Sequence, residues 1–280
     1  MWFFGQGPVV PVLRFSGPIG MATPLRPGLS IGHAASAIEK AFELSKTPAV
    51  AVVINSPGGS PVQSSLIFRR IRQLAEEKKK TVYVFCEDVA ASGGYYLALA
   101  GDEIYADPSS IIGSIGVIFA GFGFDKAMQK IGIERRVYTA GENKDALDPF
   151  RPENPADIER IKSVQRDVHD VFIGIVKERR AGRLRGADGE LFSGAFWSGP
   201  KALELGLIDG ISDVRSKMRE LYGDKVRLKV VPLEKGGLLG RLRRSTSAAG
   251  YEELSTGRLA FANDLISAVE ARSLWSRFGL

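Results

Sequence analysis

The chain has 280 residues, of which 44% are hydrophobic and 25% charged, and its formal net charge is +6. This length and composition are typical of a folded, soluble protein with a sizeable core, and they exclude a disordered or fibrous chain. Basic residues gather in two runs, at 69–80 and 241–245, as on solvated helix faces or tails. No nucleic-acid motif accompanies them, so we expect no nucleic-acid partner, and attraction to an anionic membrane surface stays open.

Cysteine and apolar content indicate the compartment. The single cysteine, Cys86, excludes an intrachain disulfide. It is predicted to be a buried core residue, with a thiol nucleophile as the second interpretation. A membrane-spanning helix needs about 20 apolar residues, and neither the start of the chain nor the Gly-rich region 111–124 supplies them. Because a secretory signal is also missing, we expect a cytoplasmic protein without a transmembrane helix, with peripheral contact to the inner membrane as an alternative.

Short β-rich runs alternate with helix-like runs between residues 48 and 140. The turn "SPGG" is followed by Ser60 and Pro61, an N-cap and first-turn proline that predict a helix. Repeated β-α-β units with short connections imply parallel pairing and an α/β fold. The expected strands are 49–55, 81–86, 103–107, 114–119 and 134–139, and the expected helices include one around His33, one from Ser60, one from about Gly93 and one at 124–132.

A long helix is predicted at about 155–181, because apolar residues fall on one face at steps of three and four. This stripe should pack against the sheet or a neighbouring subunit. A helix from Pro200 and a strand at 227–233 follow. Residues 234–257 resemble a linker, and 258–278 are predicted to form an amphipathic helix. We therefore expect one domain, 1–233, followed by a basic linker and helical tail, 234–280.

A serine among small residues stands out in "DVAASGGYY" (88–96). Ser92 ends a predicted strand and precedes a predicted helix, so its hydroxyl should be exposed as a nucleophile. The alanines and glycines on either side would let a substrate backbone come close. A serine hydroxyl is a weak nucleophile at neutral pH, however, and needs a base beside it.

Histidines and lysines are the candidate bases. His33 and His169, the two histidines of the chain, lie in predicted helices, where a surface histidine is the more frequent interpretation. A buried lysine with a lowered pKa could serve instead, as in Ser-Lys variants of the catalytic triad. Lys144 differs from the other lysines because it lies in a polar loop directly after a predicted strand. From the residues alone, an exposed loop lysine is still the more frequent interpretation of this position.

Four motifs change that interpretation: "INSPGGSP", "VAASGGYYLALAGDEIYADPSSIIGSIGV", "YTAGENKDALDPF" and "FWSGPKALELGLIDG", in this order. Together they resemble the signal peptide peptidase A (SppA/SohB) family of bacterial serine proteases, which has the ClpP/crotonase fold. The resemblance covers roughly residues 8–215. It implies that Ser92 is the nucleophile and Lys144 the general base. It also implies that Ser114, the first serine of "GSIGV", hydrogen-bonds the lysine and orients it.

Backbone amides are the expected oxyanion donors. The N–H of Gly93, at the start of a predicted helix, would point toward a developing oxyanion. The resemblance places the second donor in the "PGG" turn at 57–59, where glycine permits a positive φ, with Gly59 preferred slightly over Gly58. A plain strand-to-helix turn is the other interpretation, and a phosphate loop is disfavoured because no Gly-Lys-Ser/Thr follows. Without a His/Cys/Asp cluster of ligand spacing or a P-loop, no metal, ATP or other cofactor is expected.

The resemblance also bears on assembly. Members of the family typically carry an N-terminal membrane anchor, which this sequence does not show, so a soluble or peripheral member that acts on cytosolic peptides is considered beside one that acts on signal-peptide remnants. Short members, with one copy of the fold per chain, assemble into rings or domes. We therefore expect a homo-oligomer whose active sites are completed at subunit interfaces and whose monomer is inactive.

Three functions remain as hypotheses. The favoured one is a serine endopeptidase with a Ser92–Lys144 dyad that cleaves peptides or signal-peptide remnants through an acyl-enzyme. The alternatives are a crotonase-like acyl-CoA enzyme, which would use the paired amides on a thioester enolate, and a catalytically silent peptide-binding scaffold. Val89, Leu97 and the run 111–119 are expected to line a groove for aliphatic side chains, with burial in the core as the other interpretation.

Overall fold

The computed structural model describes residues 7–20, 28–233, 269 and 272–280. Within this part of the chain, eight strands form one sheet in the order β6-β5-β3-β2-β1-β8, with β4 beside β3 and β7 beside β4. All pairs are parallel except β5 with β6, which confirms the predicted α/β class. The strands are β1 (Val9–Ser16), β2 (Ala49–Ser56), β3 (Thr81–Ala91), β4 (Glu103–Ala106), β5 (Ile111–Gly113), β6 (Phe196–Ser198), β7 (Gly210–Ile211) and β8 (Arg227–Val231).

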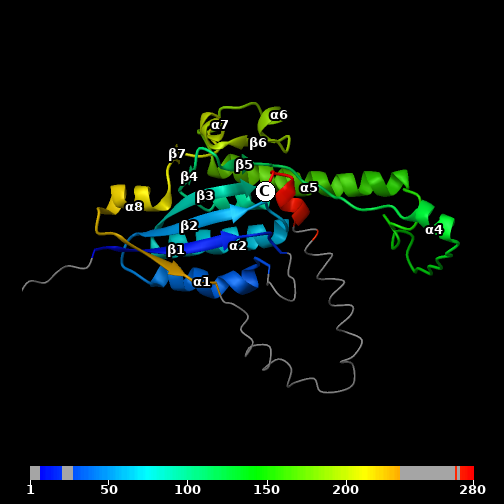
Figure 1. Ribbon diagram of the computed structural model, residues 1–280, viewed down its shortest axis with the longest axis horizontal. Helices are drawn as coiled ribbons and strands as arrows, with labels where there is room; N and C mark the ends of the chain where they lie inside the picture. Colours follow the sequence, from blue (N-terminus) through cyan, green and yellow to red (C-terminus); the bar gives the residue numbers. More distant parts are fainter. Residues whose placement is uncertain (1–6, 21–27, 234–268, 270–271) are drawn as a thin grey trace, which may run out of the picture.

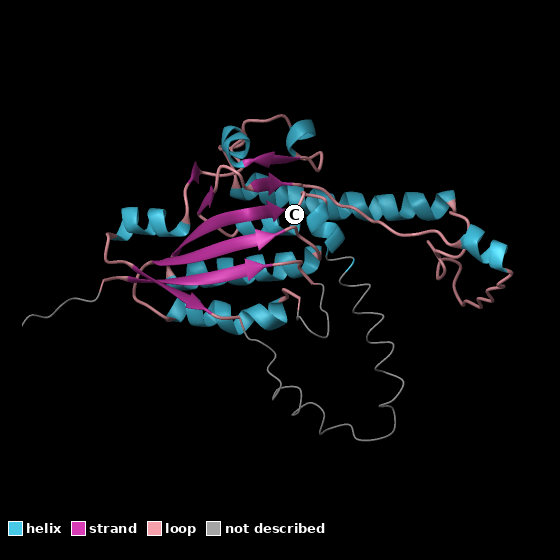
Figure 2. Cartoon of the chain, viewed as in Figure 1, coloured by secondary structure: helices cyan, strands magenta, loops and turns pink. Residues whose placement is uncertain are grey.

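Helices cover both faces of the sheet (Figures 1 and 2). Side chains of α1, α2, α3 and α5 pack on the face that carries Leu13 and Val52, whereas Met218 of α8 packs on the face that carries Val12 and Ala51. Successive strand residues point to opposite faces, so the apolar run of β2 is buried on both sides. The helices are α1 (Ile31–Glu43), α2 (Pro61–Lys78), α3 (Gly93–Ala98), α4 (Asp125–Ile131), α5 (Pro155–Arg179), α6 (Asp188–Leu191), α7 (Gly199–Glu204) and α8 (Val214–Tyr222).

The start of α2 follows the local signals of the sequence. Ser60 Oγ accepts a hydrogen bond from the Gln63 amide, and Pro61 is the first residue of the helix. A proline costs nothing at this position because its missing N–H would have had no helical partner. The turn that precedes α2, residues 56–59, is thereby held at the end of β2.

Two predicted strands are wrong. β5 ends at Gly113, and no strand forms at 114–119 or at 134–139. Both runs are rich in β-branched residues, but no neighbouring strand lies beside them to complete a ladder. The chain instead leaves the sheet and forms a projection, residues 117–154, which includes α4 and which we call the arm. Figures 1 and 2 show the arm at the far end of α5, away from the sheet.

The start of the chain brings one further difference, and most of the predicted tail is not described. β1, which the pattern of the sequence does not predict, lies between β2 and β8. The predicted linker 234–257 lies outside the described residues, as does most of the predicted helix 258–278. Residues 272–276 are helical. Phe278 packs there against Val89 and against the ring of Phe196, 5.2 Å away.

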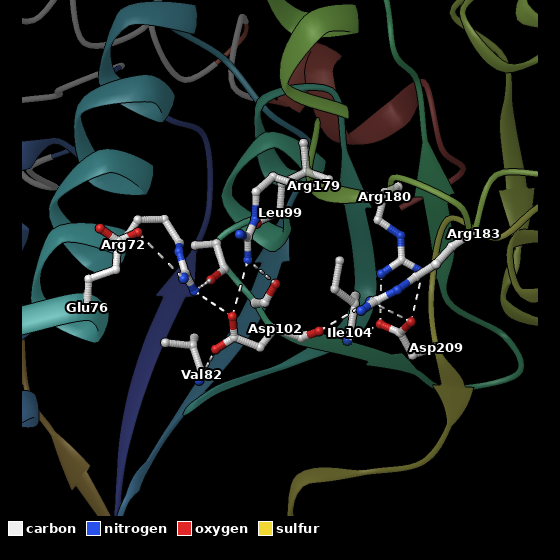
Figure 3. A network of polar contacts seen from close by, with 12 residues as sticks. Arg72, Glu76, Val82, Leu99, Asp102, Ile104, Arg179, Arg180, Arg183 and Asp209 are labelled. Atoms are coloured by element: carbon white, nitrogen blue, oxygen red, sulfur yellow. Dashed lines mark hydrogen bonds and ion pairs between the residues drawn. The ribbon is translucent and has the colours of Figure 1, made fainter. Parts of the chain in front are cut away.

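A buried ion pair fastens the end of α5 to the sheet (Figure 3). Arg180 is 1% exposed and donates two hydrogen bonds to the Asp209 carboxylate, at 2.8 and 3.0 Å. Asp209 also accepts hydrogen bonds from the Ile104 amide and from Arg183. Burial by itself raises the pKa of Asp209, but these hydrogen bonds and the charge of Arg180 outweigh it and lower the pKa below its usual value.

A second carboxylate, that of Asp102, joins α2 and α5. Asp102 accepts hydrogen bonds from Arg72 of α2 at 2.8 Å and from Arg179 of α5 at 3.3 Å. The Val82 amide of β3 donates to the same carboxylate at 2.8 Å (Figure 3). The Asp102 carboxylate thus links α2 and α5 on one face of the sheet.

Replacing Asp209 by Asn should destabilise the fold by about 3 kcal/mol at neutral pH, because it leaves a buried guanidinium without a counter-charge. A carboxylate with a lowered folded-state pKa stabilises the protein fully above its unfolded pKa of about 3.9, and the contribution disappears as the pH falls through the folded value. Urea unfolding from neutral pH down to about pH 3 should therefore show a difference from wild type that shrinks with acid.

The control for this prediction is Asp224→Asn. Asp224 pairs with Arg219 on the surface, where the two side chains are 86% and 48% exposed. Exposed pairs contribute less than about 1 kcal/mol. Equal losses in the two variants, or an Asp209→Asn loss that does not depend on pH, would contradict the role given to the buried pair.

Candidate active site

Ser92 lies in a strained turn between β3 and α3. Its backbone has φ 52° and ψ −123°, a conformation that residues other than glycine rarely adopt. The Ser92 amide donates to Gly113 O at 2.7 Å, and its carbonyl accepts from the Tyr96 amide at 2.9 Å. These two bonds hold the turn against β5 and start α3. A sharp strand-to-helix turn of this kind lifts a serine hydroxyl out of the sheet.

Ser114 lies beside Ser92. β3 and β5 are parallel, and Ala91 is in register with Gly113, so the residues that follow them are neighbours. Ser114 is buried, also has φ 52°, and donates its amide to Ala195 O at 2.7 Å. Its hydroxyl has no hydrogen-bond partner within the described part of the chain. The structure thus brings together two strained serines, one of which holds an unused hydroxyl.

The glycine turn before α2 lies against Ser92. Gly58 and Gly59 have φ 102° and 140°, and a Cβ on Gly58 would lie 2.8 Å from Ser92 Cβ. The Gly58 amide donates to Ser56 Oγ at 3.2 Å. The amides of Gly59 and Gly93, by contrast, have no acceptor among the described residues. Two unpaired N–H groups beside a serine can stabilise an oxyanion.

A pocket of about 330 Å³ opens at this serine, and Ser92, Gly59 and Gly93 line it. Its walls are apolar and come mainly from α2 and α5, the two helices joined through Asp102. Such a pocket suits an aliphatic side chain of a bound molecule. The apolar lining residues are Pro61, Val62 and Leu66 of α2, Val168, Val171 and Phe172 of α5, and Tyr96 and Val117.

The groove residues expected from the sequence are mostly wrong. Val89 and Leu97 are fully buried in the core and do not line the pocket. From the run 111–119, Val117 lines it together with Gly116, whereas Ile112 is core. The sequence held a signal for the true walls, because positions 62, 66 and 69 share one face of α2 that does not point to the core.

Lys144 lies elsewhere. It is in the arm, exposed, and its amide donates to Gly141 O at 3.3 Å. It does not line the pocket at Ser92, and the arm extends away from the sheet (Figure 1). The structure of one chain therefore brings Ser92, Ser114, Gly59 and Gly93 together, but it does not bring Lys144 to them.

The other candidate nucleophile and bases do not reach Ser92 either. His33 bonds locally to Ser30 Oγ, at 2.9 Å, at the start of α1. His169 is half-buried, and its Nε2 donates to Ile115 O at 3.1 Å, which ties α5 to the residue after Ser114. Burial raises the pKa of the Cys86 thiol to about 12, so this cysteine stays protonated at neutral pH. No group of three or more metal-binding side chains occurs in the described ranges.

The fold and the site together have the form of a serine hydrolase on an α/β scaffold, and comparisons with known proteins specify the family. A profile of Peptidase family S49 matches residues 74–226. A putative protease of Synechocystis sp. is 35% identical over 200 residues, which are 69% of this chain and 70% of that protein. The chain belongs to peptidase family S49.

A longer relative carries a different name. The Na(+)/H(+) antiporter NhaA of Brucella abortus is 54% identical over 272 residues, 97% of this chain but 37% of that protein. The chain thus spans little more than a third of this relative, so the activity in the relative's name is not assigned to this chain. Among the described residues, we find no helix with the length and apolar character needed to cross a membrane.

A solved structure supports the fold. The chain titled "1510-N membrane-bound stomatin-specific protease", in a mutant form, matches with a TM-score of 0.50 at 16% sequence identity. The match covers 81% of this chain and 99% of that chain. At this identity the likeness concerns the fold alone, and it supports the predicted α/β fold.

Proposed function

We propose that this chain is a serine endopeptidase in which Ser92 is the nucleophile and Lys144 the general base. The observation that carries the proposal is the strained Ser92, with two unpaired amides beside it, at the end of an apolar pocket. Ser92 Oγ attacks the peptide carbonyl, and the amides of Gly59 and Gly93 donate to the oxyanion. The lysine takes the hydroxyl proton and passes it to the leaving amine, after which water releases the acyl group from Ser92.

We further propose that Lys144 reaches Ser92 from a second copy of the chain. The arm holds Lys144 away from its own pocket, while the Ser114 hydroxyl beside Ser92 has no hydrogen-bond partner among the described residues and could orient an incoming amine. Exposed apolar surface of this kind is typical of a protein interface. The large apolar side chains that the arm exposes are Ile118, Phe119, Phe122, Phe124, Ile131, Ile133, Val137, Tyr138 and Phe150.

On this proposal the working enzyme is a homo-oligomer, a ring or dome with active sites at its interfaces, and a monomer is inactive. Its substrates are peptides or proteins, cleaved next to an aliphatic side chain that enters the apolar pocket. Signal-peptide remnants are one source of such peptides. We place the enzyme in the cytoplasm, with peripheral contact to the inner membrane as the alternative.

Hydrolysis of a fluorogenic peptide with an aliphatic residue at the cleavage site tests the dyad. Activity should rise between about pH 6 and pH 10, because a lysine accepts a proton only as a neutral amine. It should vanish in Ser92→Ala and in Lys144→Ala, compared at equal oligomer content. Lys130→Ala, which removes another exposed lysine of the arm, is the matched control and should retain the pH profile.

Other outcomes point to other functions. Activity that is lost in Ser92→Ala but kept in Lys144→Ala would move the base elsewhere, with His169 as the nearest alternative because it contacts the residue after Ser114. A wild-type protein that cleaves no peptide and does not react with a serine-directed covalent probe would favour the acyl-CoA enzyme or the silent scaffold.

A further inference from the structure

Among the described residues that line the pocket beside Ser92, Arg69 is the single charged side chain. We propose that Arg69 binds a carboxylate of the substrate, so that the peptidase selects peptides with an acidic group near the cleaved bond. This inference rests on the proposed peptidase function of Ser92 and adds a substrate class to it: peptides that are apolar at one position and anionic at another.

Arg69 is free to bind a ligand. It is exposed, and within the described ranges it makes no hydrogen bond, ion pair or ring contact. Its neighbours on α2 are occupied, since Arg70 donates to Glu39 at 2.6 Å and Arg72 to Asp102 at 2.8 Å. The guanidinium of Arg69 therefore keeps its five donors, whose planar arrangement matches a carboxylate.

The position of Arg69 sets where the carboxylate should be. Val62, Leu66 and Arg69 share one face of α2, and Val62 lies near the helix start, beside the Gly59 turn. Seven residues of α-helix span about 10 Å, which equals about three residues of extended peptide. A peptide that lies along the groove from Ser92 thus brings a group two or three residues from the cleaved bond to Arg69. That group is either an acidic side chain or the carboxylate of the peptide's own C-terminus.

The surroundings favour such a contact. Leu66, Val171 and Phe172 give the pocket that Arg69 lines apolar walls. Apolar walls lower the local dielectric and strengthen an ion pair relative to open solvent. Glu76 of α2 and Asp102, which lies between α3 and β4, both pair with Arg72, so they do not compete for Arg69.

Matched peptide pairs test the proposal. One set carries Glu or Gln at each of the three positions on either side of the cleaved bond, and a second set ends in a free or an amidated C-terminus. Wild type should prefer the carboxylate member of at least one pair by about tenfold in kcat/KM. Arg69→Gln should reduce that ratio to about one, and Arg69→Glu should reverse it in favour of the Gln or amidated member of the pair. Arg70→Gln, on the same helix but outside the pocket, should keep the wild-type ratio.

Two results would overturn the proposal. Either the ratios are the same in wild type and Arg69→Gln, or Arg69→Gln slows both members of every pair equally, as expected if the side chain only covers an apolar wall. If only the Glu and Gln pairs change with Arg69→Gln, Arg69 binds an acidic side chain. If only the free and amidated pairs change, it binds the C-terminal carboxylate.

Binding to the Ser92→Ala variant separates this inference from the peptidase function. Fluorescence anisotropy of the labelled peptides gives the ratio of Kd values without any cleavage. If wild type cleaves none of the peptides, the proposed function fails, yet a carboxylate preference in binding that disappears with Arg69→Gln still supports the Arg69 site. If no pair differs in binding, the Arg69 site is wrong whatever the peptidase assay shows.

Discussion

An equimolar mixture of Ser92→Ala and Lys144→Ala chains is expected to regain peptidase activity that neither variant has alone. If each site takes its serine from one copy and its lysine from the next, random mixing leaves about a quarter of the sites with both groups intact. The structure motivates this result because Lys144 is exposed in the arm and does not line the pocket at Ser92. Co-expression with two affinity tags, followed by tandem purification and the fluorogenic assay, measures it.

The control for the mixture is subunit exchange itself. A co-purified pair of Ser92→Ala chains with different tags should show mixed oligomers and no activity. If mixed oligomers of Ser92→Ala and Lys144→Ala form but stay inactive, Lys144 serves its own chain or is not the base. The arm would then have to fold back over α5 in the active state.

Ser92→Gly is expected to make the protein more stable while it abolishes activity. Ser92 has φ 52° and ψ −123°, and a strained backbone of this kind costs about 1–3 kcal/mol. Glycine removes most of this strain but adds entropy to the unfolded chain, so a net gain of about 1 kcal/mol in the free energy of unfolding remains. Ser92→Ala keeps the strain and should change stability little, while peptidase activity falls about 10⁴-fold or more. Urea unfolding and the peptide assay measure the two effects.

Lys79→Gly serves as the control for strain without function. Lys79 also has a positive φ, 51°, at the C-terminal end of α2, far along the helix from the pocket. Glycine there should stabilise the fold and leave peptidase activity unchanged. A loss of stability in Ser92→Gly would show that the turn is held by contacts of the serine side chain instead of being strained for function.

Local signals predicted much of the fold. The buried run of β2, the Ser60 cap of α2 and the apolar spacing of α5 act within a few residues of each other, so they can be read without knowledge of the rest of the chain. The two runs predicted as strands at 114–119 and 134–139 show the limit of such signals. A strand forms only when another strand lies beside it, and the neighbours of these runs are decided by the path of the whole chain.

The candidate site divides in the same way. The sequence by itself determined which residues carry chemistry: a serine among small residues, a glycine turn and a loop lysine, all in motifs that resemble a peptidase family. The register of β3 with β5 places Ser114 beside Ser92, and the two helices joined through Asp102 place Val62, Leu66 and Arg69 in one pocket. Only the tertiary structure decided which residues lie beside Ser92. It also decided the direction of the arm that carries Lys144. Distances between residues far apart in the sequence depend on pairing and packing, which no local pattern encodes.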